Sequence, residues 1–135
     1  MKILPILILV FLVLACSSLD NSPEMRALER MQEEPKKQAA RANVSITTKE
    51  SKRATKNVLL LDVTIDNQST FAAKDFEVEC SVYGGSGTEL QYLKRMIYES
   101  VKSKEKKTAK DINFGLSHNQ SARYGCTLLD FALEK

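Results

Sequence analysis

Apolar and polar side chains alternate along the chain from about residue 43 to its end. The clearest run covers residues 58–66, in which leucine, valine and isoleucine share one face of an extended chain. Alternation with a period of two is typical of a half-buried β-strand. Shorter runs of this kind cover residues 44–47, 76–82, 112–114 and 124–128. Six or seven short strands separated by turn residues predict an all-β fold, a small β-sandwich over residues 43–135.

Three parts of this pattern are less regular. Residues 88–101 fit both a helical stripe and an alternating strand; their place after the glycine-rich loop at residues 84–87 favours a strand, and the choice stays open. Residues 103–107 carry too much charge to be buried and are predicted to form a loop. The apolar parity changes between Leu128 and Leu129, which predicts a bulge of one extra residue in the last strand.

The segment before the sandwich, residues 16–42, is polar and poor in large apolar side chains. Ser22 and Pro23 are typical of a helix start, with serine at the N-cap and proline at the first helical position. Pro35 lacks a backbone donor and its ring clashes with the preceding turn, so the predicted helix is short, covering residues 23–33. We expect a solvated tether; a short coiled-coil seam or a helix lying on the domain are the alternatives.

At the amino terminus, Lys2 precedes an apolar run from Ile3 to Leu14, which is shorter than the ~20 residues needed to span a bilayer. Its length fits the hydrophobic region of a secretory signal peptide. The run ends in Val13-Leu14-Ala15-Cys16, which resembles the lipobox of bacterial lipoprotein precursors.

This resemblance implies that residues 1–15 are a signal peptide and that Cys16 carries diacylglycerol and an amino-terminal acyl group such as palmitate. The lipid anchor makes the membrane one partner, because two or three acyl chains hold a protein stably where one chain is marginal. By the sorting rule of Gram-negative lipoproteins, Ser17 in place of aspartate favours the outer membrane, facing the periplasm. The predicted location is therefore the bacterial cell envelope.

Three short motifs lie in the sandwich region: Val63-x-Ile65-x-Asn67-x-Ser69, Lys74-Asp75-x-x-Val78, and Val82-Tyr83 before a glycine-containing turn. Together they resemble the FxLYD family of small bacterial immunoglobulin-like domains. The resemblance implies an immunoglobulin-like sandwich and supplies no catalytic residue. Cys80 and Gly84 stand where the family has phenylalanine and aspartate, and the Pro-Gly turn expected near residues 102–106 is missing.

Two cysteines remain besides the lipid site, Cys80 and Cys126, both at inward positions of predicted strands. The cell envelope permits disulfides, and a bond that closes a loop of this length stabilises by ~4 kcal/mol in the chain-entropy model. The sequence Tyr124-Gly125-Cys126 also echoes the tyrosine corner of immunoglobulin domains, although the chain has no tryptophan to complete that pattern. We favour a Cys80–Cys126 disulfide over two buried thiols that never meet.

Little in the sequence indicates catalysis. His118 is the single histidine and lies among turn residues, so a catalytic triad or a histidine metal site lacks its parts. Glu77 and Glu79 point the same way along one strand, but a solvated strand face explains them more simply than a cation site. No phosphate loop, nucleotide fingerprint or paired CxxC motif is present. We therefore expect no enzyme, no cofactor and no resident metal.

The net charge of +3 is too small to indicate a nucleic-acid-binding protein. Basic residues are nevertheless concentrated in two runs, residues 36–56 and residues 102–110. The candidate contacts for an anionic partner in the second run are Lys102, Lys104, Lys106, Lys107 and Lys110. Charge runs in loops are more often simply solvated.

The sequence thus predicts a non-enzymatic, lipid-anchored binding or assembly module with an envelope protein as its partner, held through loops or an open strand edge. The alternative is a small envelope inhibitor or exclusion lipoprotein, which acts against an incoming enzyme, phage or transfer system. In that case Tyr83, Ser86 and His118 are among the expected contacts.

Overall fold

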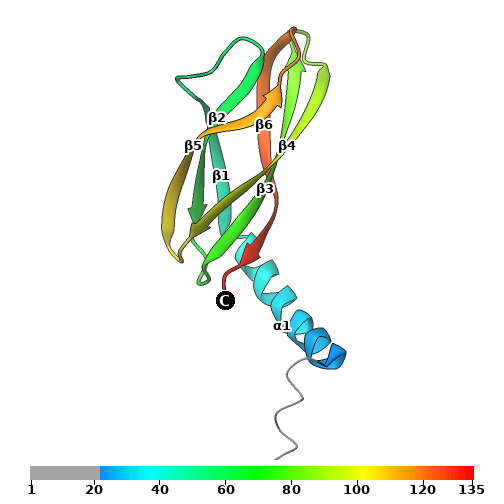
Figure 1. Ribbon diagram of the computed structural model, residues 1–135, viewed down its shortest axis with the longest axis vertical. Helices are drawn as coiled ribbons and strands as arrows, with labels where there is room; N and C mark the ends of the chain where they lie inside the picture. Colours follow the sequence, from blue (N-terminus) through cyan, green and yellow to red (C-terminus); the bar gives the residue numbers. More distant parts are fainter. Residues whose placement is uncertain (1–21) are drawn as a thin grey trace, which may run out of the picture. The chain divides into compact units, whose positions relative to one another are not determined.

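The structure is a computed structural model, and it describes residues 22–135. Cys16 and the predicted signal peptide lie outside the described residues. The chain divides into two compact units, Met1–Lys36 and Lys37–Lys135, each of which is described by itself. One helix, α1 (Pro23–Arg41), starts in the first unit and ends in the second (Figure 1).

In the first unit, helix α1 begins where the sequence predicts it. The Met25 amide donates to the Ser22 hydroxyl at 3.3 Å, which is the expected serine N-cap. The side chains of Met25, Leu28 and Met31 are 41%, 56% and 73% exposed.

The predicted end of this helix near residue 33 is wrong, because α1 continues past Pro35 to Arg41. Proline costs a helix one hydrogen bond, but contacts within the second unit hold the last turn in place. Ala40 is only 1% exposed there, and the Asn43 side-chain amide donates to the Ala39 carbonyl at 3.2 Å. Tertiary contacts therefore outweigh the local preference against a helix.

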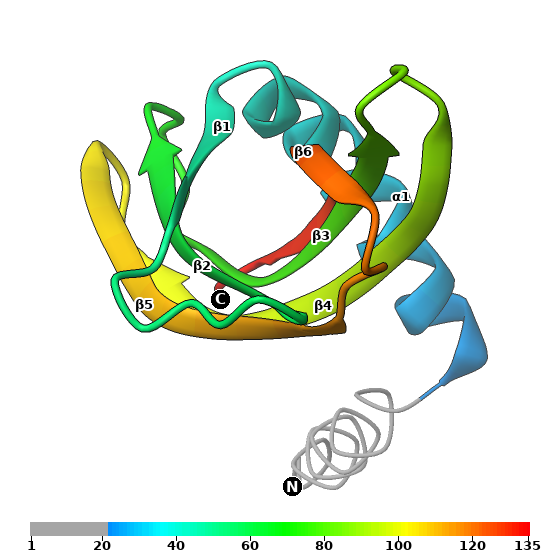
Figure 2. The same cartoon turned by 90° about the horizontal axis from the view of Figure 1, so that it is seen from above.

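The second unit is an antiparallel β-sandwich, which confirms the predicted fold class. Its strands are β1 (Val44–Glu50), β2 (Val58–Asn67), β3 (Ala73–Gly84), β4 (Glu89–Val101), β5 (Glu105–Leu116) and β6 (Ser121–Leu133). They form two three-stranded sheets with the orders β1-β2-β5 and β4-β3-β6. Figure 2 shows the strands of both sheets arranged around a common interior.

The core comes from the two central strands, as their alternation predicts. Every second residue of β2 from Leu59 to Ile65 is buried, and so is every second residue of β3 from Phe76 to Val82. The ring of Phe131 on β6 packs against Phe76 with centroids 6.1 Å apart. Burial on one face of each central strand fixes the register, since a slip of one residue exposes the whole apolar set.

The less regular stretches are now resolved. Residues 89–101 form strand β4, so the strand reading is correct. The predicted loop at residues 103–107 is too long, because β5 already starts at Glu105. From there the strand pairs with β2, and exposed charged side chains alternate along it with less exposed ones. The predicted bulge is confirmed: Val78 pairs with Leu128 and Glu77 with Asp130, which leaves Leu129 as the extra residue.

Candidate binding surfaces

Cys80 and Cys126 form the predicted disulfide, with their sulfur atoms 2.05 Å apart. The two cysteines lie directly opposite each other on β3 and β6, so the bond joins neighbouring strands of one sheet. In immunoglobulin domains the corresponding bond crosses between sheets. The tyrosine-corner echo also fails, because the Tyr124 side chain bonds Thr48 on β1 instead of a nearby backbone group.

The first candidate surface is the outer face of β4, the edge strand of the second sheet. Tyr92, Met96 and Tyr98 alternate along it and are 63%, 38% and 81% exposed. We call these three residues the β4 face. Tyrosine and methionine are enriched in protein–protein interfaces, and these three side chains lie on one face of one strand.

The charges beside the β4 face are compensated within the sheet. Lys94 lies between Met96 and Tyr92 on the same face, and its ammonium group is 3.8 Å from Glu77 and 3.9 Å from Glu79. This pairing accounts for the two glutamates that the sequence left as a weak cation candidate. Among residues 22–135 no group of three or more acidic, cysteine or histidine side chains could hold a metal ion.

Tyr92 itself stays protonated over a wide pH range. A hydrogen bond with Glu89, together with the negative charge of that carboxylate, raises the pKa of the Tyr92 hydroxyl. Tyr92 therefore contributes a neutral aromatic ring to the β4 face at physiological pH.

The second candidate surface is a pocket of about 520 Å³ at the end of the sandwich where β6 begins. We call it the end pocket. Its buried floor includes Leu59 from β2 and Val82 from β3, and its rim includes Glu50, Lys56 and Arg123. This volume lies within the range of ~300–1,000 Å³ found for ligand pockets, and an apolar floor with a few polar groups is typical of them.

Two tyrosines lie near the end pocket: Tyr124 lines it, and Tyr83 contacts the lining residue Arg123. The Arg123 guanidinium lies 5.5 Å from the centroid of the Tyr83 ring, a cation–π contact. Partial burial and the nearby Glu50 carboxylate raise the pKa of Tyr124, against a hydrogen bond with Thr48 that lowers it. The pocket thus presents a neutral tyrosine, one carboxylate and two cationic side chains.

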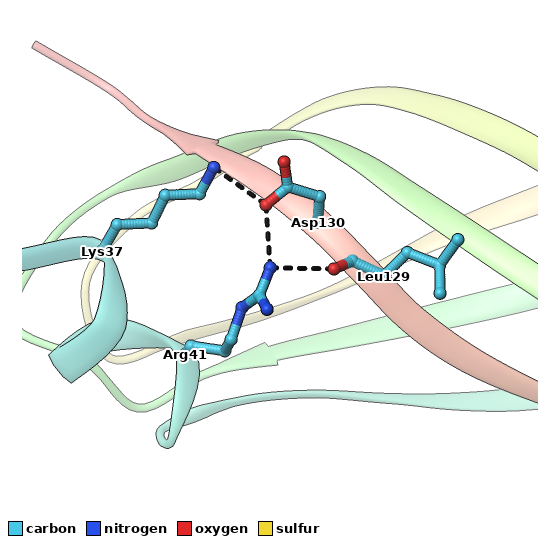
Figure 3. A network of polar contacts seen from close by, with 4 residues as sticks. All are labelled: Lys37, Arg41, Leu129 and Asp130. Atoms are coloured by element: carbon cyan, nitrogen blue, oxygen red, sulfur yellow. Dashed lines mark hydrogen bonds and ion pairs between the residues drawn. The ribbon is translucent and has the colours of Figure 1, made fainter. Parts of the chain in front are cut away.

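The other end of strand β6 carries a group of polar contacts that we call the helix clasp, Lys37, Arg41, Leu129 and Asp130 (Figure 3). The Asp130 carboxylate accepts from Lys37 at 2.8 Å and from Arg41 at 3.0 Å, and Arg41 also donates to the Leu129 carbonyl at 2.9 Å. Partial burial alone raises the pKa of Asp130, but bonds from Lys37, the Phe131 amide and Arg41 outweigh it and hold that pKa below its usual value. The clasp binds the last turn of α1 to the extra residue of the bulge.

The structure does not gather the basic run at residues 102–110 into one free patch. Lys106 pairs with Asp66 at 3.0 Å and Lys107 with Glu99 at 2.7 Å, while Lys104 donates to the Gln68 carbonyl. These are contacts within the protein, so most of the run serves the fold. Binding of an anionic partner by Lys102, Lys104, Lys106, Lys107 and Lys110 stays a prediction.

The loop residues proposed for an inhibitor lie at the end of the sandwich that holds the end pocket. Tyr83 and Ser86 flank Gly84, which pairs with Ser121 at the start of β6. His118 is exposed in the loop between β5 and β6; its ring Nδ1 accepts from the Gln120 amide at 3.1 Å, as in an ordinary turn.

In the sequence, Tyr92, Met96 and Tyr98 fit the alternating pattern of residues 88–101, and that pattern did not single them out as a surface. Their alternation was visible, but alternation alone does not say which face of an edge strand is buried. The charged neighbour Lys94, which shares their face, was the signal that this face is exposed.

Comparison with known proteins returns no matching family model, no similar curated protein and no similar solved structure. The lipobox and FxLYD resemblances therefore stay predictions. Within residues 22–135 no helix combines the length and apolar character needed to cross a bilayer.

Proposed function

We propose that this protein is a non-enzymatic, lipid-anchored binding module of the bacterial cell envelope, which holds a protein partner against the β4 face. The observation that carries the proposal is the exposure of Tyr92, Met96 and Tyr98 in one row on an edge strand. Three large side chains give an interface the aromatic centre that dominates its binding free energy.

The chemistry of the β4 face indicates what the partner offers. Since Lys94 is compensated by Glu77 and Glu79, apolar and aromatic contact is the main interaction that remains available. The partner is therefore a protein surface with exposed apolar side chains, and the association depends little on salt. The acyl chains on Cys16 keep the module at the membrane while the sandwich makes this contact.

The test compares variants of the β4 face in the native envelope. Tyr92→Ser/Tyr98→Ser removes both exposed rings, and Leu116→Ser is the matched control because Leu116 is 73% exposed on β5, outside the face. Crosslinking in intact cells should give a discrete adduct with the wild type and with Leu116→Ser. The adduct should fall at least tenfold in the double variant.

Equal adduct yields in all three proteins would show that the β4 face is not the contact surface. The anchor is tested separately by mass spectrometry of the native protein, which should find a mature chain that starts at an acylated Cys16. An unmodified Cys16, or an uncut leader, contradicts the anchor and the location but not the role of the β4 face.

A further inference from the structure

We propose that the open edge of β6 beside the end pocket accepts an extended, acidic segment of a protein partner as an added strand. This site lies apart from the β4 face and does not depend on it. The inference rests on the register of β6, on the residues that line the end pocket and on the charge at its rim.

The register shows which backbone groups of β6 face away from β3. Cys80 and Cys126 have Cα atoms 4.0 Å apart, the short spacing of an antiparallel pair that exchanges no hydrogen bonds. In such a pair both the N–H and the C=O point away from the neighbouring strand. The ladder is regular from Val82↔Tyr124 to Val78↔Leu128, so Tyr124 and Leu128 are oriented in the same way.

Strand β6 is the last strand of its sheet, and nothing among residues 22–135 pairs with this side of it. Unpaired edges of this kind are where extended peptides add to a sheet. Only the far part of the edge is covered, since Arg41 donates to the Leu129 carbonyl beyond the bulge. Among residues 22–135 no strand pairs with the part from Ser121 to Leu128, and β1 reaches it only through the side-chain bond between Thr48 and Tyr124.

The end pocket lies along this open part and determines which side chains fit. A residue added opposite Tyr124 points inward with it, toward the floor formed by Leu59 and Val82. A residue opposite Arg123 points outward, beside that guanidinium. Gly125 leaves open space on this outward face, because nothing lies within 4 Å of the place where its own Cβ would be.

Charge at the rim selects acidic residues for the outward positions. Arg123 and Lys56 are both exposed, and Glu50 is the single carboxylate among the lining residues. Lys49 and Lys52, from the first basic run of the sequence, are exposed on the adjoining segment. The segment that fits best alternates apolar residues, which point into the pocket, with acidic residues, which point outward.

The probe is a synthetic eight-residue peptide that alternates valine and glutamate, with both ends blocked. The protein is the full chain, labelled with ¹⁵N and held in phosphatidylcholine nanodiscs, so that the lipid adds no net charge. At saturation, the amides of Tyr124, Cys126 and Leu128 should exchange with solvent at least tenfold more slowly. The amides of Gly125 and Thr127, which already bond β3, should change less than twofold.

Two variants and two control peptides test the mechanism. Arg123→Glu and Lys56→Glu should each weaken binding at least tenfold, whereas Lys110→Glu, an equal charge change on β5, should alter it less than twofold. A valine–lysine peptide and a backbone N-methylated valine–glutamate peptide should not bind. Tyr92→Ser/Tyr98→Ser should bind the probe as the wild type does, which separates this site from the β4 face.

The proposal is overturned by any of three results. The first is saturation without protection of the three edge amides. The second is equal affinity for the valine–lysine peptide. The third is unchanged affinity in both rim variants, with folding of each checked by its amide spectrum. Decanoate is a further probe, which tests whether the pocket takes a small amphiphile instead of a strand. If decanoate perturbs the signals of Leu59 and Val82 and the peptide does not, the pocket belongs to a small ligand and the proposal is overturned as well.

Discussion

The two ends of the sandwich differ in how they use their largest polar side chains. At the end where β2 finishes, Asn67 and Ser69 are 0% and 3% exposed, and their side chains bond backbone groups. At the other end, Lys56 and Arg123 are exposed around the end pocket. Buried, fully bonded polar groups specify a fold, whereas exposed charges around a cavity contribute little to stability and remain available for a ligand.

The Asn67 end works as a connector between the sheets. The Asn67 amide group donates to the carbonyls of Phe71 at 2.8 Å, Val101 at 3.1 Å and Lys102 at 3.1 Å, and its oxygen accepts from the Ser69 hydroxyl at 2.7 Å. Because Asn67 ends β2 and Val101 ends β4, one side chain joins the two layers. At the pocket end the layers are joined by more exposed contacts, since the Gln91 side chain on β4 donates to the Leu116 carbonyl on β5 at 3.0 Å and the Tyr124 side chain bonds Thr48.

The largest effect is expected from removing the disulfide, which lies next to Tyr124 on β6. Cys80→Ala/Cys126→Ala should lower the free energy of unfolding by about 4 kcal/mol, since the bond closes a loop with a sequence separation of 46 residues. The pocket end should loosen most, because among residues 22–135 no strand pairs with β6 on the side away from β3. Urea unfolding gives the total loss. Hydrogen exchange should then rise more at residues 121–126 than at Asn67, and a uniform rise contradicts the contrast between the ends.

The next largest effect is expected at the opposite end. Asn67→Ala removes the donor to the buried Val101 carbonyl and to the partly buried Phe71 and Lys102 carbonyls, and it leaves the buried Ser69 amide without its acceptor. Each unmet buried group is costly, so we expect a loss of about 3 kcal/mol. Asn119→Ala, in the exposed turn near the end pocket, is the matched control and should stay within about 0.5 kcal/mol of wild type. Thermal unfolding of both variants measures the difference, and similar losses would mean that the two ends do not differ.

This contrast also explains which parts of the fold the sequence could predict. The alternation in β2 and β3 predicted the core, and the parity change at Leu128 predicted the bulge, because both follow from local pattern. In the sequence, Asn67 and Ser69 stand out only as part of a motif. The burial of Asn67 was not predicted, since two of the carbonyls that it bonds, those of Val101 and Lys102, come from residues more than thirty positions away.

The candidate surfaces were harder to predict for a similar reason. The inward positions of Cys80 and Cys126 indicated a disulfide, but not that it joins adjacent strands, which depends on strand order. The basic runs were visible as composition. Only the fold shows that Lys106 and Lys107 pair with carboxylates while Lys56 borders a pocket.

A smaller effect is expected at the helix clasp, near the Asn67 end. Asp130→Asn removes two partly exposed ion pairs and should cost about 0.5–1 kcal/mol at neutral pH. Because the pKa of Asp130 is lowered in the folded protein, this contribution is present above the unfolded value of about 3.9 and is lost as the pH falls through the lower folded value. Urea unfolding at a series of pH values from 7 downward should show the gap between wild type and Asp130→Asn narrowing once the pH falls below about 4. A gap that stays constant over the whole series contradicts the assignment to this carboxylate.

The smallest effect is expected at the rim of the end pocket. Arg123→Ala removes a cation–π contact with Tyr83 at an exposed site, which is worth about 0.5 kcal/mol. Thermal unfolding should therefore shift far less than in Asn67→Ala, although Arg123 has the larger side chain. A loss as large as that at Asn67 would make Arg123 a structural residue and remove the reason to regard the rim charges as free for a partner. If Arg123→Ala costs little stability and Arg123→Glu weakens peptide binding tenfold, the role of Arg123 is to bind a partner.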